Sequence, residues 1–138
     1  MLRRNEKVAL IKSVPLFQHC SKKELADVAS IADMLDLPEG RVLTREGDRG
    51  REFFVLVDGT VEIRRGGEKL HDLGPGAFFG EIALITKSPR TATVTASSPI
   101  EALVIEGHAF RALLGRSPGI AVKVLLALAE RVPTAVPG

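Results

Sequence analysis

The middle of the chain alternates short apolar segments with turn signals, and this pattern constrains the fold more than any other feature. Between residues 34 and 106 the segments are rich in Val, Ile, Leu, Thr and Phe. Turn residues interrupt them at 38–40, 47–48, 58–59, 66–67, 74–76 and 98–99. Short segments punctuated in this way are typical of all-β domains. We therefore expect about eight strands in an antiparallel β-barrel or jelly roll, that is, a double-stranded β-helix.

Individual segments indicate which strands face the core. Residues 60–64 and 92–97 alternate apolar and polar side chains, as strands with one buried face do. Residues 52–57, in contrast, are apolar on both faces. We expect this last segment to be a central, buried strand.

Helical patterns flank the strand-rich region. Residues 3–12 are compatible with a helix that ends before Pro15, because the residue before a proline avoids the helical region. Ser21 and Glu24 form a capping-box pattern, which predicts a helix over 22–33 with Ala32 on its apolar face. Further helices are predicted over 108–116 and 119–131. We expect one domain over 1–138, with an N-terminal helical segment (1–33), the barrel (34–106), C-terminal hinge and lid helices (107–131) and a tail (132–138).

Composition excludes several classes of protein. The hydrophobic fraction is 45% and the charged fraction 26%, as in ordinary globular domains. A net charge of +2, without Tyr or Trp, does not favour nucleic-acid binding. The single cysteine, Cys20, fits a reducing compartment, and we expect it to be a semi-buried structural residue. With neither a signal peptide nor a long apolar run in view, the expected location is the cytoplasm, with no membrane contact.

One segment departs from the strand pattern. Residues 81–85, Glu-Ile-Ala-Leu-Ile, are apolar without alternation and could form a helical turn directly after Gly80. The amides of Ile82 and Ala83 would then be free to bind an anion. Arg90 follows ten residues after Gly80, and its planar fork suits a phosphate. Taken alone, however, Arg90 could simply pair with Glu81 on the surface.

Glu81 is out of place beside an anion unless it accepts a hydrogen bond from a sugar hydroxyl, as acidic residues do in dinucleotide sites. A phosphate and a ribose hydroxyl held by adjacent residues require a compact nucleotide. A 3′,5′-cyclic phosphate has that shape.

The same residues carry a resemblance to a known family. Residues 79–84, Phe-Gly-Glu-Ile-Ala-Leu, followed after four residues by 89–94, Pro-Arg-Thr-Ala-Thr-Val, resemble the phosphate-binding cassette (79–94) of cyclic nucleotide-binding domains. Residues 13–17 look like the helical motif that precedes the barrel in this family. The family includes protein kinase A regulatory subunits, cyclic nucleotide-gated channels and catabolite activator proteins.

The resemblance implies a role for each matching position. Gly80, Ile82 and Ala83 would contact the phosphate and ribose through their backbone, and Glu81 would bind the ribose 2′-OH. Arg90 would pair with the phosphate, and the Ala92 amide would add a contact. Thr91 would lie where the family can bond a syn purine, which leaves the choice between cAMP and cGMP open, with cAMP favoured. Leu84 and Phe110 look like the hydrophobic hinge pair that couples binding to movement of the C-terminal helices, although both could equally be core residues.

The last predicted helix is apolar nearly all round, so we expect it to be covered on two sides. A second copy of the chain, an effector domain, or the N-terminal helices could cover it.

Three rival interpretations remain beside a cyclic nucleotide sensor. A metal-binding jelly-roll enzyme needs clustered histidines, whereas His19, His71 and His108 are scattered and nucleophile motifs are missing, so we expect neither catalysis nor a metal. The chain ends soon after its last helix, so we expect no direct DNA binding, although it could be a fragment of a transcription regulator, channel or kinase. A cGMP-selective domain, or a degenerate one that binds nothing and serves as an interaction module, also stays open.

Overall fold

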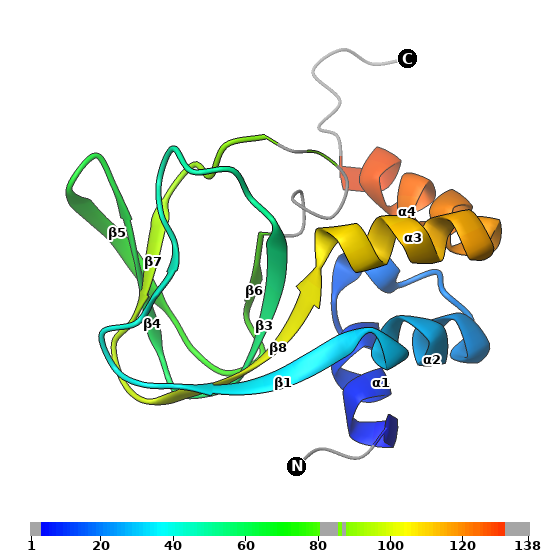
Figure 1. Cartoon of the computed structure of the whole chain (residues 1–138), viewed down its shortest axis with the longest axis horizontal. Helices are drawn as coiled ribbons and strands as arrows, with labels where there is room; N and C mark the ends of the chain where they lie inside the picture. The colour runs from blue at the N-terminus through cyan, green and yellow to red at the C-terminus, as the bar shows by residue number, and fades with distance from the viewer. Residues whose placement is uncertain (1–3, 81–85, 87, 132–138) are drawn as a thin grey trace.

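The computed structural model describes residues 4–80, 86 and 88–131, and its N-terminal part is helical (Figure 1). The elements here are α1 (Arg4–Lys12), the 3-10 helix η1 (Pro15–Phe17) and α2 (Lys22–Ser30). The predicted capping box is present, because Ser21 Oγ accepts the Glu24 N–H at 3.2 Å and Glu24 Oε1 accepts the Ser21 N–H at 2.7 Å.

The predicted end of this helix was wrong. Helix α2 stops at Ser30, and β1 begins at Ala32, before the expected barrel boundary. Ala32 pairs with Ile105 of the last strand and is 2% exposed. Burial in a long-range strand pair therefore outweighs the local helical pattern at this residue.

In the described residues, eight strands form two antiparallel sheets of four, in the orders β1-β8-β3-β6 and β2-β7-β4-β5. Their bounds are β1 (Ala32–Leu37), β2 (Val42–Thr44), β3 (Glu52–Asp58), β4 (Val61–Arg65), β5 (Glu68–Leu73), β6 (Phe78–Phe79), β7 (Thr93–Ala96) and β8 (Ile100–Glu106). The expected jelly roll is confirmed. Across the part of the chain that is described, however, hydrogen bonding does not join the sheets into one closed barrel.

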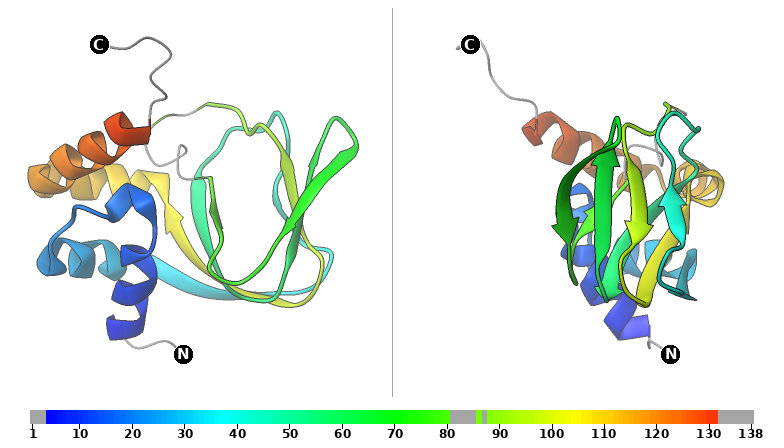
Figure 2. Two further views of the ribbon diagram at one scale, coloured as in Figure 1. Left: turned by 180° about the vertical axis from the view of Figure 1, so that it is seen from behind. Right: turned by 90° about the vertical axis from the view of Figure 1, so that its left-hand side faces the viewer.

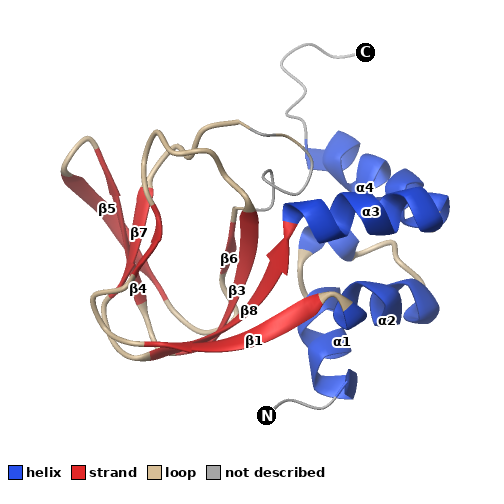
Figure 3. Ribbon diagram, in the orientation of Figure 1, coloured by secondary structure: helices blue, strands red, loops and turns tan. Residues whose placement is uncertain are grey.

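The sheet containing β3 and β8 lies between the second sheet and the helices (Figure 3). Along β3, Phe53 and Val55 pack toward the helices, whereas Phe54 and Leu56 pack toward the other sheet. This placement explains why the sequence of β3 is apolar on both faces, and it confirms the predicted central strand. The two cores thus share one sheet, and the helices cover its outer face (Figure 2).

Two helices end the described chain, α3 (Gly107–Arg116) and α4 (Pro118–Arg131). Ile120, Val124 and Ala127 of α4 are buried on the side that packs against η1 and α3. One apolar face is therefore covered by helices of the same chain. The other is open, with Val122, Leu125 and Leu126 exposed by 56%, 66% and 50%. None of the described helices is by itself long and apolar enough to span a bilayer; only α3 and α4 taken together, bent by 117°, meet that length and composition.

Candidate functional site

A cavity of about 250 Å³ opens beside the ends of β4, β6 and β7. Its described walls come from both sheets and from the segment that precedes β7. The lining residues are Thr44, Ile63, Arg65, Leu70, His71, Phe79, Gly80, Arg90, Thr91, Ala92 and Val94. Four of the residues selected from the sequence, Gly80, Arg90, Thr91 and Ala92, therefore meet at one cavity.

Arg90 lies directly against Gly80. The guanidinium is half-buried, and its Nη2 donates to the Glu52 carbonyl at 2.6 Å. Gly80 has φ +83°, and a Cβ at this position would overlap Arg90 Nη1 and come within 2.8 Å of the Glu52 carbonyl. Only glycine adopts this conformation without strain and lets the guanidinium pass so closely.

Burial also affects the pKa of Arg90. Desolvation lowers the pKa of the guanidinium, and the negative charge of Glu52 opposes this effect. Arginine nevertheless stays protonated in proteins. The site therefore holds a fixed positive charge that is partly removed from water, where its attraction to an anion is stronger than at the surface.

The backbone of Arg90 is fixed by the loop that precedes β3. Arg90 N–H donates to the Asp48 carbonyl at 2.7 Å, and Gly47 N–H donates to the Arg90 carbonyl at 2.9 Å. Arg49 and Pro89 add an isolated antiparallel bridge. Residues 47–49 thus hold the main chain of Arg90 in place beside the cavity.

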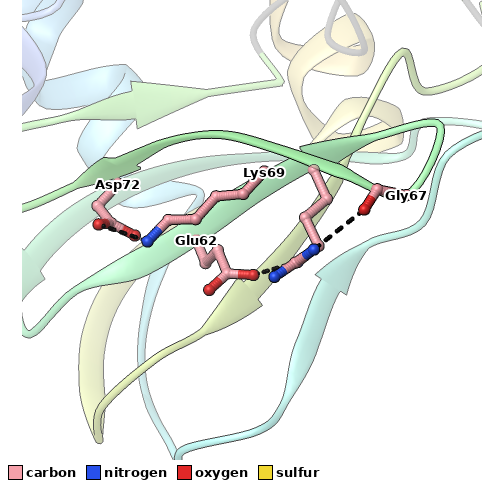
Figure 4. A network of polar contacts seen from close by, with 5 residues as sticks. Glu62, Gly67, Lys69 and Asp72 are labelled. Atoms are coloured by element: carbon pink, nitrogen blue, oxygen red, sulfur yellow. Dashed lines mark hydrogen bonds and ion pairs between the residues drawn. The ribbon is translucent and has the colours of Figure 1, made fainter.

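The β4–β5 hairpin supports the opposite wall. Its turn glycines, Gly66 and Gly67, both have positive φ, and Gly66 N–H donates to Glu46 Oε1 at 2.9 Å. On the exposed side of the hairpin, Arg64 contacts Glu62 and donates to the Gly67 carbonyl at 3.0 Å, while Lys69 and Asp72 are 3.1 Å apart (Figure 4). The same hairpin carries Arg65, Leu70 and His71, which line the cavity.

Thr91 and Ala92 are held through their carbonyl groups. Arg65 Nε donates to the Thr91 carbonyl, and the buried Thr44 hydroxyl donates to the Ala92 carbonyl, both at 3.0 Å. The Thr91 residue itself is exposed at the cavity edge. Thr91 is therefore accessible to a ligand that enters the cavity.

The remaining predicted site residues do not line the described part of the cavity. Glu81, Ile82, Ala83 and Leu84 are outside the described residues. Phe110 is fully buried, and its ring meets Phe17 edge-on at 5.8 Å.

Sequence reasoning missed the Glu52 carbonyl and the support from Asp48. Both act through backbone atoms, which any residue type supplies, so the sequence carries no signal for them. Thr44 and Arg65 were missed as well, because their positions in strands gave no hint that their side chains reach toward the cassette.

The three histidines are far from forming a ligand set. His19 Nε2 lies 2.7 Å from Glu130 Oε1, His71 lines the cavity, and His108 lies in the first turn of α3. Within the described ranges, His, Cys, Asp and Glu do not gather in any group of three that could hold a metal ion.

Comparison with known protein families assigns the chain, and with it the cavity, to one family. The family model described as the cyclic nucleotide-binding domain matches residues 34–117. This range includes most of β1, all of β2 to β8, the described cavity wall and α3. The chain belongs to the cyclic nucleotide-binding domain family. The resemblance noted from residues 79–94 is thereby confirmed at the level of the family.

Relatives of this cyclic nucleotide-binding domain include longer proteins. This chain is 35% identical over 119 residues to a putative potassium channel protein of Rhodopseudomonas palustris. The match covers 84% of this chain and 29% of the channel protein. The chain is 34% identical over 119 residues to a cAMP-dependent protein kinase regulatory subunit of Mycosarcoma maydis, covering 80% of this chain and 23% of that subunit. The chain thus spans less than a third of either relative.

A solved structure shows the same architecture. The N-terminal domain of a transcriptional regulator from Streptomyces coelicolor A3(2) superposes with a TM-score of 0.81 at 28% identity, covering 88% of this chain and 91% of that one. Domains similar to this one are therefore found within proteins named as channels, kinase regulatory subunits and transcriptional regulators.

Proposed function

We propose that this domain is a sensor that binds a 3′,5′-cyclic nucleotide, with cAMP the expected ligand, and does not convert it. Arg90 would hold the cyclic phosphate at the cavity edge. The Gly80, Ile82 and Ala83 backbone would contact the phosphate and ribose.

One observation carries this proposal: the half-buried Arg90 guanidinium lies against Gly80 at the wall of a cavity. A guanidinium has five N–H donors, so the bond to the Glu52 carbonyl leaves enough of them for a bidentate phosphate contact. The cavity, at about 250 Å³, is near the lower end of small-molecule sites. This size favours a cyclic mononucleotide over a dinucleotide.

The remaining contacts follow from the family pattern. Glu81 would accept the ribose 2′-OH, and the Ala92 N–H would donate to the phosphate. Thr91 would face the base, where a hydroxyl tolerates either purine. One relative is the regulatory subunit of a protein kinase whose name describes it as cAMP-dependent. This name supports cAMP as the first ligand to test.

We propose that binding acts on the C-terminal helices through a continuous row of aromatic rings. Phe78, two residues before Gly80, lies 6.2 Å from Phe53, which lies 6.3 Å from Phe17, which lies 5.8 Å from Phe110. Ring separations of this size are typical of packed aromatic pairs. A displacement at Gly80 would therefore press through β3 and η1 on α3, the helix that precedes α4.

Isothermal titration calorimetry with cAMP, cGMP and cyclic dinucleotides tests the proposal. We expect saturable binding of a cyclic mononucleotide to the parent chain. Arg90→Ala should weaken it by about 2–4 kcal/mol, because one side of a partly desolvated, charge-assisted contact is lost. Arg90→Lys should lie between the two, since it keeps the charge and loses the fork.

Arg41→Ala is the matched control, because Arg41 is exposed and lies outside the cavity wall. It should bind as the parent does. If no cyclic nucleotide binds the parent, or if Arg90→Ala binds as tightly as Arg41→Ala, the proposed function is wrong, and an interaction module becomes the better interpretation.

A further inference from the structure

A second cavity, of about 240 Å³, lies where residues 49–51, just before β3, meet the start of α3. It is lined by Arg49, Gly50, Arg51, Glu106, His108 and Arg111. None of these residues lines the cavity beside Gly80, so the two are separate sites.

The charge around this cavity is strongly positive. Three arginines and one glutamate line it, which leaves two net positive charges before His108 is counted. A concave surface lined by more positive than negative side chains focuses an electric field that attracts anions.

The backbone of the cavity is well fixed. Gly107 N–H, at the start of α3, donates to the Arg51 carbonyl at 2.7 Å, and the N–H of the buried Gly50 donates to the Ser88 carbonyl at 3.3 Å. The main chain at residues 50 and 51 is therefore held against Ser88 and the start of α3. The first turn of α3 adds the positive end of a helix of ten residues to the same side.

From this arrangement we propose that the cavity is a second anion site, which takes a small free phosphate compound such as a diphosphate. Arginine forks match phosphate oxygens in pairs, and several arginines suit a group with more than one negative charge. Glu106 lowers the net positive charge of the cavity lining. Its carboxylate would accept a hydrogen bond from a protonated oxygen of the ligand.

NMR titration of the ¹⁵N-labelled chain with inorganic pyrophosphate at low salt locates the site without any mutation. We expect saturable shifts centred on the amides of Gly50, Arg51 and His108. Shifts centred instead on Gly80 and Arg90, or an absence of saturation, would overturn the proposal. The result does not depend on whether the cavity beside Gly80 takes a cyclic nucleotide.

A pair of double variants then tests the arginines. Arg49→Ala with Arg51→Ala should weaken pyrophosphate binding tenfold or more, as expected for loss of charge-assisted hydrogen bonds. Arg41→Ala with Arg45→Ala removes the same charge from exposed residues outside this cavity, and it should change the affinity by about twofold at most. Equal weakening in both double variants would show that only the overall charge matters, and the site would be refuted.

Discussion

At the scale of single residues, Gly80 is where conformation and function meet. Its φ of +83° is costly for any residue with a Cβ, by about 1–2 kcal/mol. In addition, a Cβ there would overlap Arg90 Nη1 and crowd the Glu52 carbonyl at 2.8 Å. We expect Gly80→Ala to lower the free energy of unfolding by about 2–4 kcal/mol in total and to weaken cAMP binding at least tenfold, because the guanidinium must move. Urea denaturation and calorimetry measure the two effects.

Gly40→Ala separates strain from contact. Gly40 has a nearly identical φ of +89°, but a Cβ there would meet no atom within 4 Å. This variant should show the conformational cost alone and bind ligand normally. If the two variants lose equal stability and neither loses affinity, the close approach of Arg90 to Gly80 has no functional weight.

At the scale of elements, Glu24 joins two helices. Its carboxylate completes the capping box of α2 and contacts Lys123 of α4, and it lies where a Cβ on Gly119 would come within 2.8 Å. These interactions, first of all the hydrogen bond from Lys123, hold the pKa of Glu24 below its usual value of 4.5. The ionised carboxylate is thus preferred by the folded chain.

The pH dependence of stability follows from this shift. Since the pKa of Glu24 is lower in the folded chain than in the unfolded chain, the stabilisation is fully present above about pH 4.5 and is lost as pH falls through the folded pKa. Glu24→Gln should therefore cost on the order of 1 kcal/mol at pH 7 and less at pH 3. Urea unfolding across this range measures the difference, with the exposed Glu39→Gln as control. A cost that does not change with pH would contradict the assigned role of the charge.

Elements differ in how far the sequence predicted them. The start of α2 was predictable, because Ser21 and Glu24 satisfy its first amides locally, and β3 was predictable because both of its faces are apolar. The strand at Ala32 was not, since its partner Ile105 lies far along the chain. The same reason hid the support of Arg90 by Asp48 and the gathering of arginines around the second cavity. Features that depend on neighbouring residues, such as the capping box, can thus be predicted from the sequence. Pairing between backbone segments that are far apart in the chain becomes evident only in the structure.

At the scale of the whole molecule, the question is how a cavity between strands could act on α4. The aromatic row runs from Phe78 in β6 to Phe110 in α3, which packs against α4, through the core on the helical side of the shared sheet. In the other core, Phe54 stacks on Phe79 at 5.1 Å. The two cores therefore offer a matched comparison. Phe17 lies on the row and Phe54 does not, although both are buried.

We expect Phe17→Leu and Phe54→Leu each to cost about 1–3 kcal/mol of stability, which a domain with an ordinary 5–15 kcal/mol tolerates. In the parent chain, cAMP should change the hydrogen exchange of amides in α4. Phe17→Leu should remove at least half of that change, because the ring that joins β3 to α3 is lost, while Phe54→Leu should keep it. The affinity for cAMP should fall less than tenfold in Phe17→Leu, since the phosphate contacts remain. If both variants lose the response equally, coupling depends on overall stability and not on the aromatic row; if neither does, α4 is reached by another route.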